Sequence, residues 1–124
     1  MSELPLYNGS CHCGAVRYQV HVDLSKPVLA CNCSICSRSG YLLTFVPMDQ
    51  FTLVAGEDSL TDYLFGHKRI HHLFCKVCGV RSFARGTSPD GTELRAINVR
   101  CLENVDLEPV PVKKVDGRAL PRPE

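Results

Sequence analysis

Cys31-Asn-Cys-Ser-Ile-Cys36 is the densest of three cysteine groups in this sequence. Cys11 and Cys13 form a C-x-C pair before it, and Cys75 and Cys78 form a C-x-x-C pair after it. Cysteines one or two residues apart can reach one tetrahedral zinc ion from a single tight turn, with zinc–sulfur distances of about 2.3 Å. Eight cysteines in 124 residues therefore indicate either metal sites or a disulfide scaffold.

The N-terminal sequence helps to decide between these two explanations. Residues 1–10 contain no basic segment followed by an apolar one, so we expect no signal peptide. No apolar run approaches the roughly 18 residues that a membrane span needs, and we expect no membrane partner. A cytoplasmic, reducing location follows as an expectation, and in such a compartment tight cysteine pairs more often hold metal than disulfides.

The seven clustered cysteines divide most simply as four plus three. The two pairs together can make a closed four-thiolate site, and the triplet can make a site with one position free. Closed zinc sites are structural and open ones are catalytic. Spacing alone leaves alternatives, because two closed structural sites are also compatible with it, and Cys101 or a histidine can complete the triplet. Gly14 and Gly79 directly follow the two pairs, where positive φ lets the backbone turn its amides toward the sulfurs.

Length and composition limit the remaining possibilities. A chain of 124 residues forms one domain, and 44% hydrophobic with 22% charged residues is typical of a globular protein rather than a disordered one. The sequence has 14 Lys and Arg and 13 Asp and Glu, which gives a formal net charge of +1. That balance argues against a general polyanion binder, so nucleic acid is an unlikely partner.

The hydrophobic pattern predicts a mostly β fold with one or two small antiparallel sheets. Val16, Tyr18, Val20 and Val22 alternate with polar residues, as in a half-buried strand. The predicted strands are Ala15–Val22, Tyr41–Val46, Phe51–Ala55, Leu60–Phe65, Ile70–Phe74, Val80–Ala84 and Leu94–Val99. Ser34–Ser39 is predicted to form a helical turn, and Ser88–Gly91 a tight turn. Residues 108–124 carry four of the eight prolines and are predicted to form an irregular C-terminal segment.

Three motifs resemble the glutathione-dependent formaldehyde-activating enzyme family: Gly9 to Tyr18, Cys31 to Gly40, and Phe74 to Gly79. Ile97 to Leu102 and the Asp-Gly-Arg at 116–118 are also similar to that family, so the resemblance covers about residues 8–118. It implies a single domain over 1–124 in which small sheets form a tent-like arrangement around two zinc ions. By this resemblance Cys11, Cys13, Cys75 and Cys78 would hold a structural zinc, and Cys31, Cys33 and Cys36 a catalytic one.

The resemblance also implies an activity. The family's named reaction adds glutathione to formaldehyde to give S-hydroxymethylglutathione, which is a carbon–sulfur lyase reaction in reverse. We therefore expect a glutathione-like thiol and a small aldehyde as partners. One rival is an enzyme with the same site chemistry and another thiol or aldehyde. A second rival is a non-enzymatic zinc module that binds protein or nucleic acid.

Five basic residues and no acidic ones lie between Tyr63 and Pro89. They can bind the carboxylates of glutathione, offset the negative charge of a four-thiolate zinc, or contact a phosphate backbone. These residues are Lys68, Arg69, Lys76, Arg81 and Arg85. Three histidines are candidates for either a functional or a structural role: His12, His71 and His72. Tyr41 and Phe45 can form the wall of a substrate pocket or belong to the core. Ser34 and Ser37 can donate hydrogen bonds to the sulfurs of the triplet.

Overall fold

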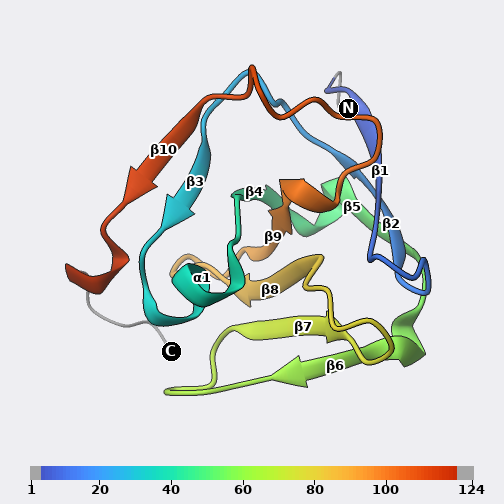
Figure 1. Ribbon diagram of the computed structural model, residues 1–124. Coiled ribbons are helices and arrows are strands. Elements are labelled where there is room, and N and C mark those ends of the chain that lie inside the picture. The colour runs from blue at the N-terminus through green and yellow to red at the C-terminus, as the bar shows by residue number, and fades with distance from the viewer. Residues whose placement is uncertain (1–3, 120–124) are drawn as a thin grey trace.

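Alternating apolar residues produce the central strand of the smaller sheet in the computed structural model, which describes residues 4–119. In β2 (Arg17–His21) Tyr18 and Val20 are buried, whereas Arg17 and Gln19 are exposed. This strand pairs antiparallel with β1 (Leu6–Ser10) on one side and β5 (Phe51–Ala55) on the other. In Figure 1 the three strands lie on the right-hand side of the view, beside the larger sheet.

The larger sheet has seven strands in the order β10-β3-β4-β9-β8-β7-β6. Their bounds are Val112–Val115 for β10, Val28–Cys31 for β3, Leu43–Pro47 for β4, Glu93–Asn98 for β9, Phe83–Thr87 for β8, His71–Cys75 for β7 and Leu60–Tyr63 for β6. All pairs are antiparallel except β10 with β3, which is parallel. The single α-helix among residues 4–119, α1 (Ser34–Ser39), follows β3. The mostly β prediction is confirmed, with one mixed sheet in place of small antiparallel ones alone.

The main hydrophobic core lies between the two sheets. Tyr18, Phe51 and Phe83 form a ring cluster, with centroids 5.2 Å apart for Tyr18 and Phe51 and 4.7 Å apart for Phe51 and Phe83. Gly9 lies directly over the Tyr18 ring, so that even a methyl group at this position would overlap the ring atoms. The smaller sheet therefore approaches the core closely only because β1 carries glycine at this point.

The C-terminal segment differs from the prediction. Residues 112–115, predicted to be irregular, form β10 and extend the larger sheet, where Val112 lies opposite Val28 and Val115 opposite Cys31. In Figure 1 the red β10 runs beside β3 at one edge of the molecule. The two central residues of β10, Lys113 and Lys114, are both exposed, so the period-two alternation that marks a strand is absent. Residues 120–124 of the predicted segment lie outside the described residues.

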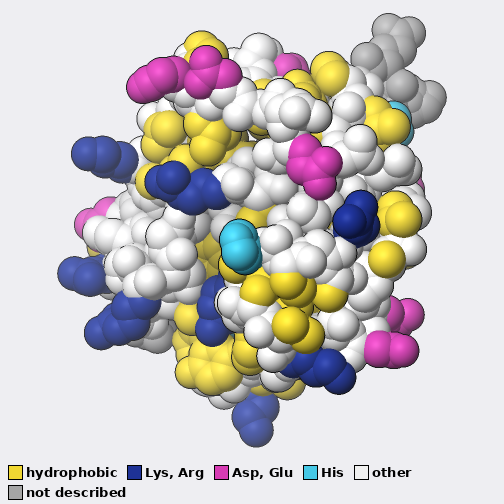
Figure 2. Space-filling model, turned by 45° about the vertical axis from the view of Figure 1, so that its right-hand side comes forward, with side chains coloured by type: hydrophobic (Ala, Val, Ile, Leu, Met, Phe, Trp, Pro, Cys, Tyr) yellow, Lys and Arg dark blue, Asp and Glu magenta, His cyan; other side chains and the backbone are white. Residues whose placement is uncertain are grey.

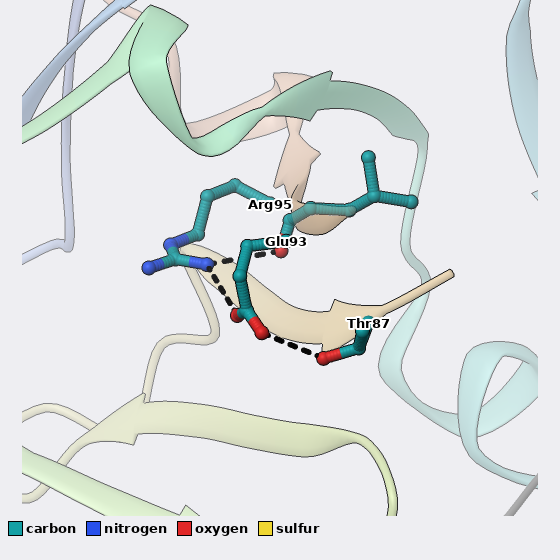
Figure 3. A network of polar contacts seen from close by, with 4 residues as sticks. Thr87, Glu93 and Arg95 are labelled. Atoms are coloured by element: carbon teal, nitrogen blue, oxygen red, sulfur yellow. Dashed lines mark hydrogen bonds and ion pairs between the residues drawn. The ribbon is translucent and has the colours of Figure 1, made fainter. Parts of the chain in front are cut away.

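The predicted strands do not include β1 and β3, and other differences concern strand ends. β8 begins at Phe83 and runs to Thr87, three residues later than the predicted Val80–Ala84. The predicted turn at Ser88–Gly91 is confirmed, because the Gly91 amide donates to the Ser88 carbonyl over 2.9 Å. At this end of the β8–β9 hairpin Thr87 donates to Glu93, which also lies 3.8 Å from Arg95 (Figure 3). Over residues 4–119, no helix has the length and apolar character to cross a membrane.

Candidate functional site

The two cysteine pairs meet in one cluster, as predicted. Cys11 and Cys13 follow β1, whereas Cys75 ends β7 and Cys78 lies in the next turn. The Sγ of Cys13 lies 3.7 Å from that of Cys11 and 3.7 Å from that of Cys75, and all four sulfurs lie within 4.8 Å of one another. Four ligands placed tetrahedrally at about 2.3 Å from one ion would be about 3.8 Å apart. The cluster therefore has the dimensions of a four-thiolate zinc site.

Backbone amides face the sulfurs of this cluster. The Val16 amide donates to Cys11 Sγ over 3.3 Å, and the Val77 amide donates to Cys75 Sγ over 3.4 Å. Such donors stabilise the thiolate form that a metal ligand requires. Amides of Cys13 and Val80 act on Cys78, and against burial they lower the pKa of its thiol to about 6.

The glycines after the two pairs serve the turns as predicted. Gly14 has φ +83° and Gly79 has φ +79°, values that favour glycine. The Gly14 amide donates to the Cys11 carbonyl, and the Gly79 amide donates to the Cys75 carbonyl over 2.7 Å. Each pair is therefore held by a tight turn that closes on its own first cysteine.

The triplet forms the second cluster. Cys31 ends β3, Cys33 is the N-cap residue of α1, and Cys36 lies inside that helix. Their sulfurs lie within 4.8 Å of one another and all three side chains are half-buried. Burial opposes ionisation of Cys33, but the amides of Cys36 and Ile35 and the neighbouring thiols outweigh it and lower the pKa of Cys33.

Over residues 4–119, no fourth His, Cys, Asp or Glu atom belongs to the triplet cluster. Cys101, which spacing allowed as a ligand, belongs to neither cluster; its Sγ lies 3.9 Å from the Arg81 carbonyl. Burial raises the pKa of the Cys101 thiol. The clusters are thus unequal, with four donors in one and three in the other.

The C-terminal segment packs directly on the triplet. The Asn32 side chain donates to Asp116 over 2.9 Å, and its oxygen accepts the Arg118 amide over 3.0 Å. Gly117 lies between these contacts and against the sulfur of Cys31. The Asp-Gly-Arg sequence therefore forms one wall of the triplet site, a role that sequence reasoning did not assign.

Replacing Gly117 by Ala is expected to weaken metal binding at the triplet by about tenfold. Changes to groups that contact metal ligands typically reduce metal affinity by about 10- to 100-fold, and this estimate is at the lower end of that range. A Cβ there would overlap Cys31 Sγ and lie 3.1 Å from the Cβ of Cys33, so the triplet has to shift. Competition with a metallochromic chelator measures this. Gly86→Ala is the matched control, because its Cβ meets Ile70 Cγ1 at 3.6 Å and the Arg69 carbonyl oxygen at 4.0 Å, both ordinary contact distances. Equal metal affinity in both variants would refute the wall assignment.

A second hydrophobic cluster lies on the sheet face away from the main core. Tyr41, Leu43, Ala84 and Ala96 are buried there, and Ile35, Cys36 and Ile70 pack against them. A cavity of about 530 Å³ opens beside this cluster and shares Ile70, Ala84 and Ala96 with it. Phe45, Arg69 and Arg85 also line the cavity. Of the triplet, Cys36 packs against this cluster, but none of the three cysteines lines the cavity itself.

The histidines lie in different environments. His12 is exposed, and His71 contacts Asp62 with 2.6 Å between Nδ1 and Oδ2. His72 is 5% exposed, and its ring stacks on Phe65 with centroids 5.2 Å apart. His71 and His72 thus occupy opposite faces of β7, as successive residues of a strand do.

His72 predicts a pH dependence of stability. Burial and the charge of Arg81 lower its pKa below 6.5, although Asp62 opposes them. The unfolded chain therefore binds this proton more readily, so the free energy of unfolding decreases as pH falls below about 6.5. We expect this component to be absent in His72→Phe, when both proteins are denatured by urea at a series of pH values with the same metal content. Parallel stability curves for the two proteins would contradict this prediction.

Both a family model and a solved structure match most of this chain. A family model described as glutathione-dependent formaldehyde-activating enzyme matches residues 6–115. A crystal structure of a Rhodobacter sphaeroides protein, a structural genomics target, superposes with a TM-score of 0.73 and 32% sequence identity. The match covers 86% of this chain and 99% of that one. Both clusters and the Asp-Gly wall lie within or directly beside the matched residues.

Proposed function

Because the chain belongs to the glutathione-dependent formaldehyde-activating enzyme family, we propose that it adds a glutathione-like thiol to formaldehyde or another small aldehyde. The observation that carries this proposal is the inequality of the two cysteine clusters, four donors against three. An open ligand position suits the binding of a substrate sulfur. We assign one zinc ion to each cluster.

The four-cysteine cluster is the structural centre in this proposal. Cys11 and Cys75 are buried, and the cluster joins the loop after β1 to the end of β7. It therefore links the small sheet to the large one, and its four thiolates leave no position for a substrate.

The triplet of Cys31, Cys33 and Cys36 is the catalytic centre. Zinc bound there supplies a site at which a substrate thiol is deprotonated at neutral pH. In the reaction the sulfur forms a bond to the aldehyde carbon, the carbonyl π bond breaks, and the proton lost from sulfur ends on the oxygen. The chain's contribution is to hold sulfur and carbonyl together, which raises their effective concentration.

The cavity beside the second hydrophobic cluster supports a thiol that carries carboxylates. Arg69 lies in its lining, and its guanidinium group can bind a carboxylate through two parallel hydrogen bonds. Of the five basic residues singled out in the sequence, Lys68, Lys76, Arg69 and Arg85 are exposed. Arg69 is the one that we assign to a glutathione carboxylate, because Arg85 alternates with Ala84 along β8 and faces Phe83 and Arg95 instead.

A nucleic-acid-binding module is the second candidate. A continuous basic stripe would favour it. On the face in Figure 2 several Lys and Arg side chains gather along the left-hand side, and the others lie apart among hydrophobic and acidic side chains. The formal net charge of +1 argues against a phosphate backbone as the general partner.

Exchange of S-hydroxymethylglutathione, followed by NMR, tests the proposal. The metal-loaded chain is expected to speed the exchange between glutathione, formaldehyde and their adduct above the rate of a protein-free sample. That control is essential because the adduct also forms without a catalyst. An unchanged exchange rate would refute the formaldehyde assignment. Parallel assays with other aldehydes would then identify the rival enzyme, and salt-sensitive DNA or RNA binding would identify the module.

A further inference from the structure

A second cavity, of about 430 Å³, opens between the two sheets. Phe51 and Leu53 of β5 line it from the smaller sheet, and Leu73 and Phe83 line it from the larger one. Its volume lies within the range of about 300–1,000 Å³ that is typical of small-molecule sites. The cavity is therefore an apolar space next to the main core that is large enough for a small ligand.

Two arginines line this cavity together. Arg85 of β8 lies directly opposite Arg95 of β9 in the antiparallel pair. Their neighbours Ala84 and Ala96 belong to the second hydrophobic cluster, against which Cys36 packs. Successive side chains of a strand point to opposite faces of the sheet, so the arginines lie on the face away from Cys36. This cavity is thus separate from the proposed catalytic centre.

The two arginines are placed unfavourably with respect to each other. Like charges directly opposite in an antiparallel pair are destabilising. The Arg95 side chain is only 14% exposed, so its charge is also largely removed from water. Burial and the charge of Arg85 both lower the pKa of Arg95, although Glu93 opposes them. An anion that contacts both guanidinium groups would offset their repulsion.

The carboxylates of the chain balance this charge only in part. Arg95 Nη1 lies 3.8 Å from Glu93 Oε1 and donates to the Leu94 carbonyl over 3.1 Å (Figure 3). The other oxygen of Glu93 accepts the Thr87 hydroxyl over 2.8 Å. Within residues 4–119, no other carboxylate oxygen lies within 4.0 Å of either guanidinium group. Arg85 and the remaining nitrogens of Arg95 can therefore donate to a ligand in the cavity.

Acidic side chains around the cavity limit the charge of such a ligand. Glu57 and Asp62 also line it, and Asp62 Oδ2 lies 2.6 Å from His71 Nδ1. Because Glu93 lies beside Arg95 as well, a doubly charged phosphate would meet more repulsion here than a singly charged carboxylate. A carboxylate also matches the two parallel donors of a guanidinium group. These surroundings favour a carboxylate on an apolar chain.

We propose that Arg85 and Arg95 bind the carboxylate of an amphipathic carboxylic acid, whose apolar chain fills the cavity between the sheets. This site goes beyond the proposed function and does not depend on it, because none of its residues belongs to a cysteine cluster. The chain of the ligand would lie against Phe51, Leu53 and Phe83. A bound ligand would therefore contact both sheets and stabilise the folded protein.

Calorimetry of the metal-loaded chain with octanoate tests this site. Octan-1-ol has the same chain length without the charge, and we expect it to bind about tenfold more weakly. Hexanoate is two CH₂ groups shorter and is expected to bind about 15-fold more weakly, since each buried CH₂ group contributes a factor of about four. Arg85→Gln and Arg95→Gln are each expected to remove most of the preference for octanoate over octan-1-ol. Because Arg85 is exposed, Arg85→Gln should keep the fold even if Arg95→Gln does not.

Lys113→Gln is the matched control, because it removes an exposed cation from β10, at the edge of the larger sheet. It should retain the preference, and so should the wild type in saturating glutathione. The melting temperature of every variant should be measured to show that it is folded. Three results would each overturn the site: no preference for octanoate in the wild type, an unchanged preference in Arg85→Gln, or displacement of octanoate by glutathione. The thiol activity is tested separately by the exchange assay and stands or falls without this site.

Discussion

The Cys75→Ser variant is expected to lose the metal ion of the four-cysteine cluster. Without the link that this ion makes between the two sheets, the chain is expected to unfold. Cys75 is 1% exposed and lies where β7 meets the turn to Cys78. Binding of a structural zinc contributes about 10–16 kcal/mol in small zinc domains, which is comparable to the whole stability of a domain, about 5–15 kcal/mol. A serine oxygen is a poor substitute for a thiolate ligand. The other three thiolates then lie close together without a metal ion to neutralise their negative charge. Far-ultraviolet circular dichroism and metal content measure this loss.

Cys101→Ser provides the matched control for this variant. Cys101 is half-buried and lies outside both clusters, so its replacement is expected to change stability by only about 1 kcal/mol. If Cys75→Ser were as stable as Cys101→Ser and kept two metal ions, the structural assignment of the four-cysteine cluster would be wrong.

Cys33→Ser is expected to lose one metal ion and all catalysis while it keeps its fold. Cys33 lies at the N-cap of α1, and serine is among the best N-cap residues, so the helix tolerates this change. The four-cysteine cluster lies elsewhere in the chain and remains intact. The exchange of S-hydroxymethylglutathione should therefore fall to the protein-free rate, and metal analysis should give one ion per chain instead of two.

Ser37→Ala is the control on the same helix. Ser37 is exposed and its hydroxyl contacts only the Ser34 carbonyl, at 3.4 Å, so both metal ions and the activity should persist. A fully active Cys33→Ser variant with two metal ions would refute the catalytic role of the triplet.

Features that depend on short stretches of sequence could be predicted. Each of the three cysteine groups follows from spacings of one or two residues, because its ligands lie in a single turn. The same holds for Gly79, which the turn needs at positive φ, and for β2, whose alternation reflects burial on one face only. The joining of the two pairs in one cluster, across 62 residues between Cys13 and Cys75, was expected from the division into four plus three and from the family resemblance, not from spacing alone.

Features that depend on pairing between distant segments could not be predicted. β10 is a strand because it lies beside β3, and its two exposed lysines give no periodic signal. Gly117 reaches the Cys31 sulfur only through that pairing. Arg85 was considered as one of five basic residues, but nothing in the sequence brings it to Arg95. The pairing of β8 with β9 does so.

Cadmium-113 NMR of the cadmium-loaded chain tests the central claim, that only one of the two metal sites keeps a position for a substrate thiol. We predict two resonances in the absence of thiol. Addition of glutathione should move one of them toward the position of a four-thiolate site and leave the other unchanged. Two resonances that both lie at the four-thiolate position from the start, and that do not respond to glutathione, would contradict the account.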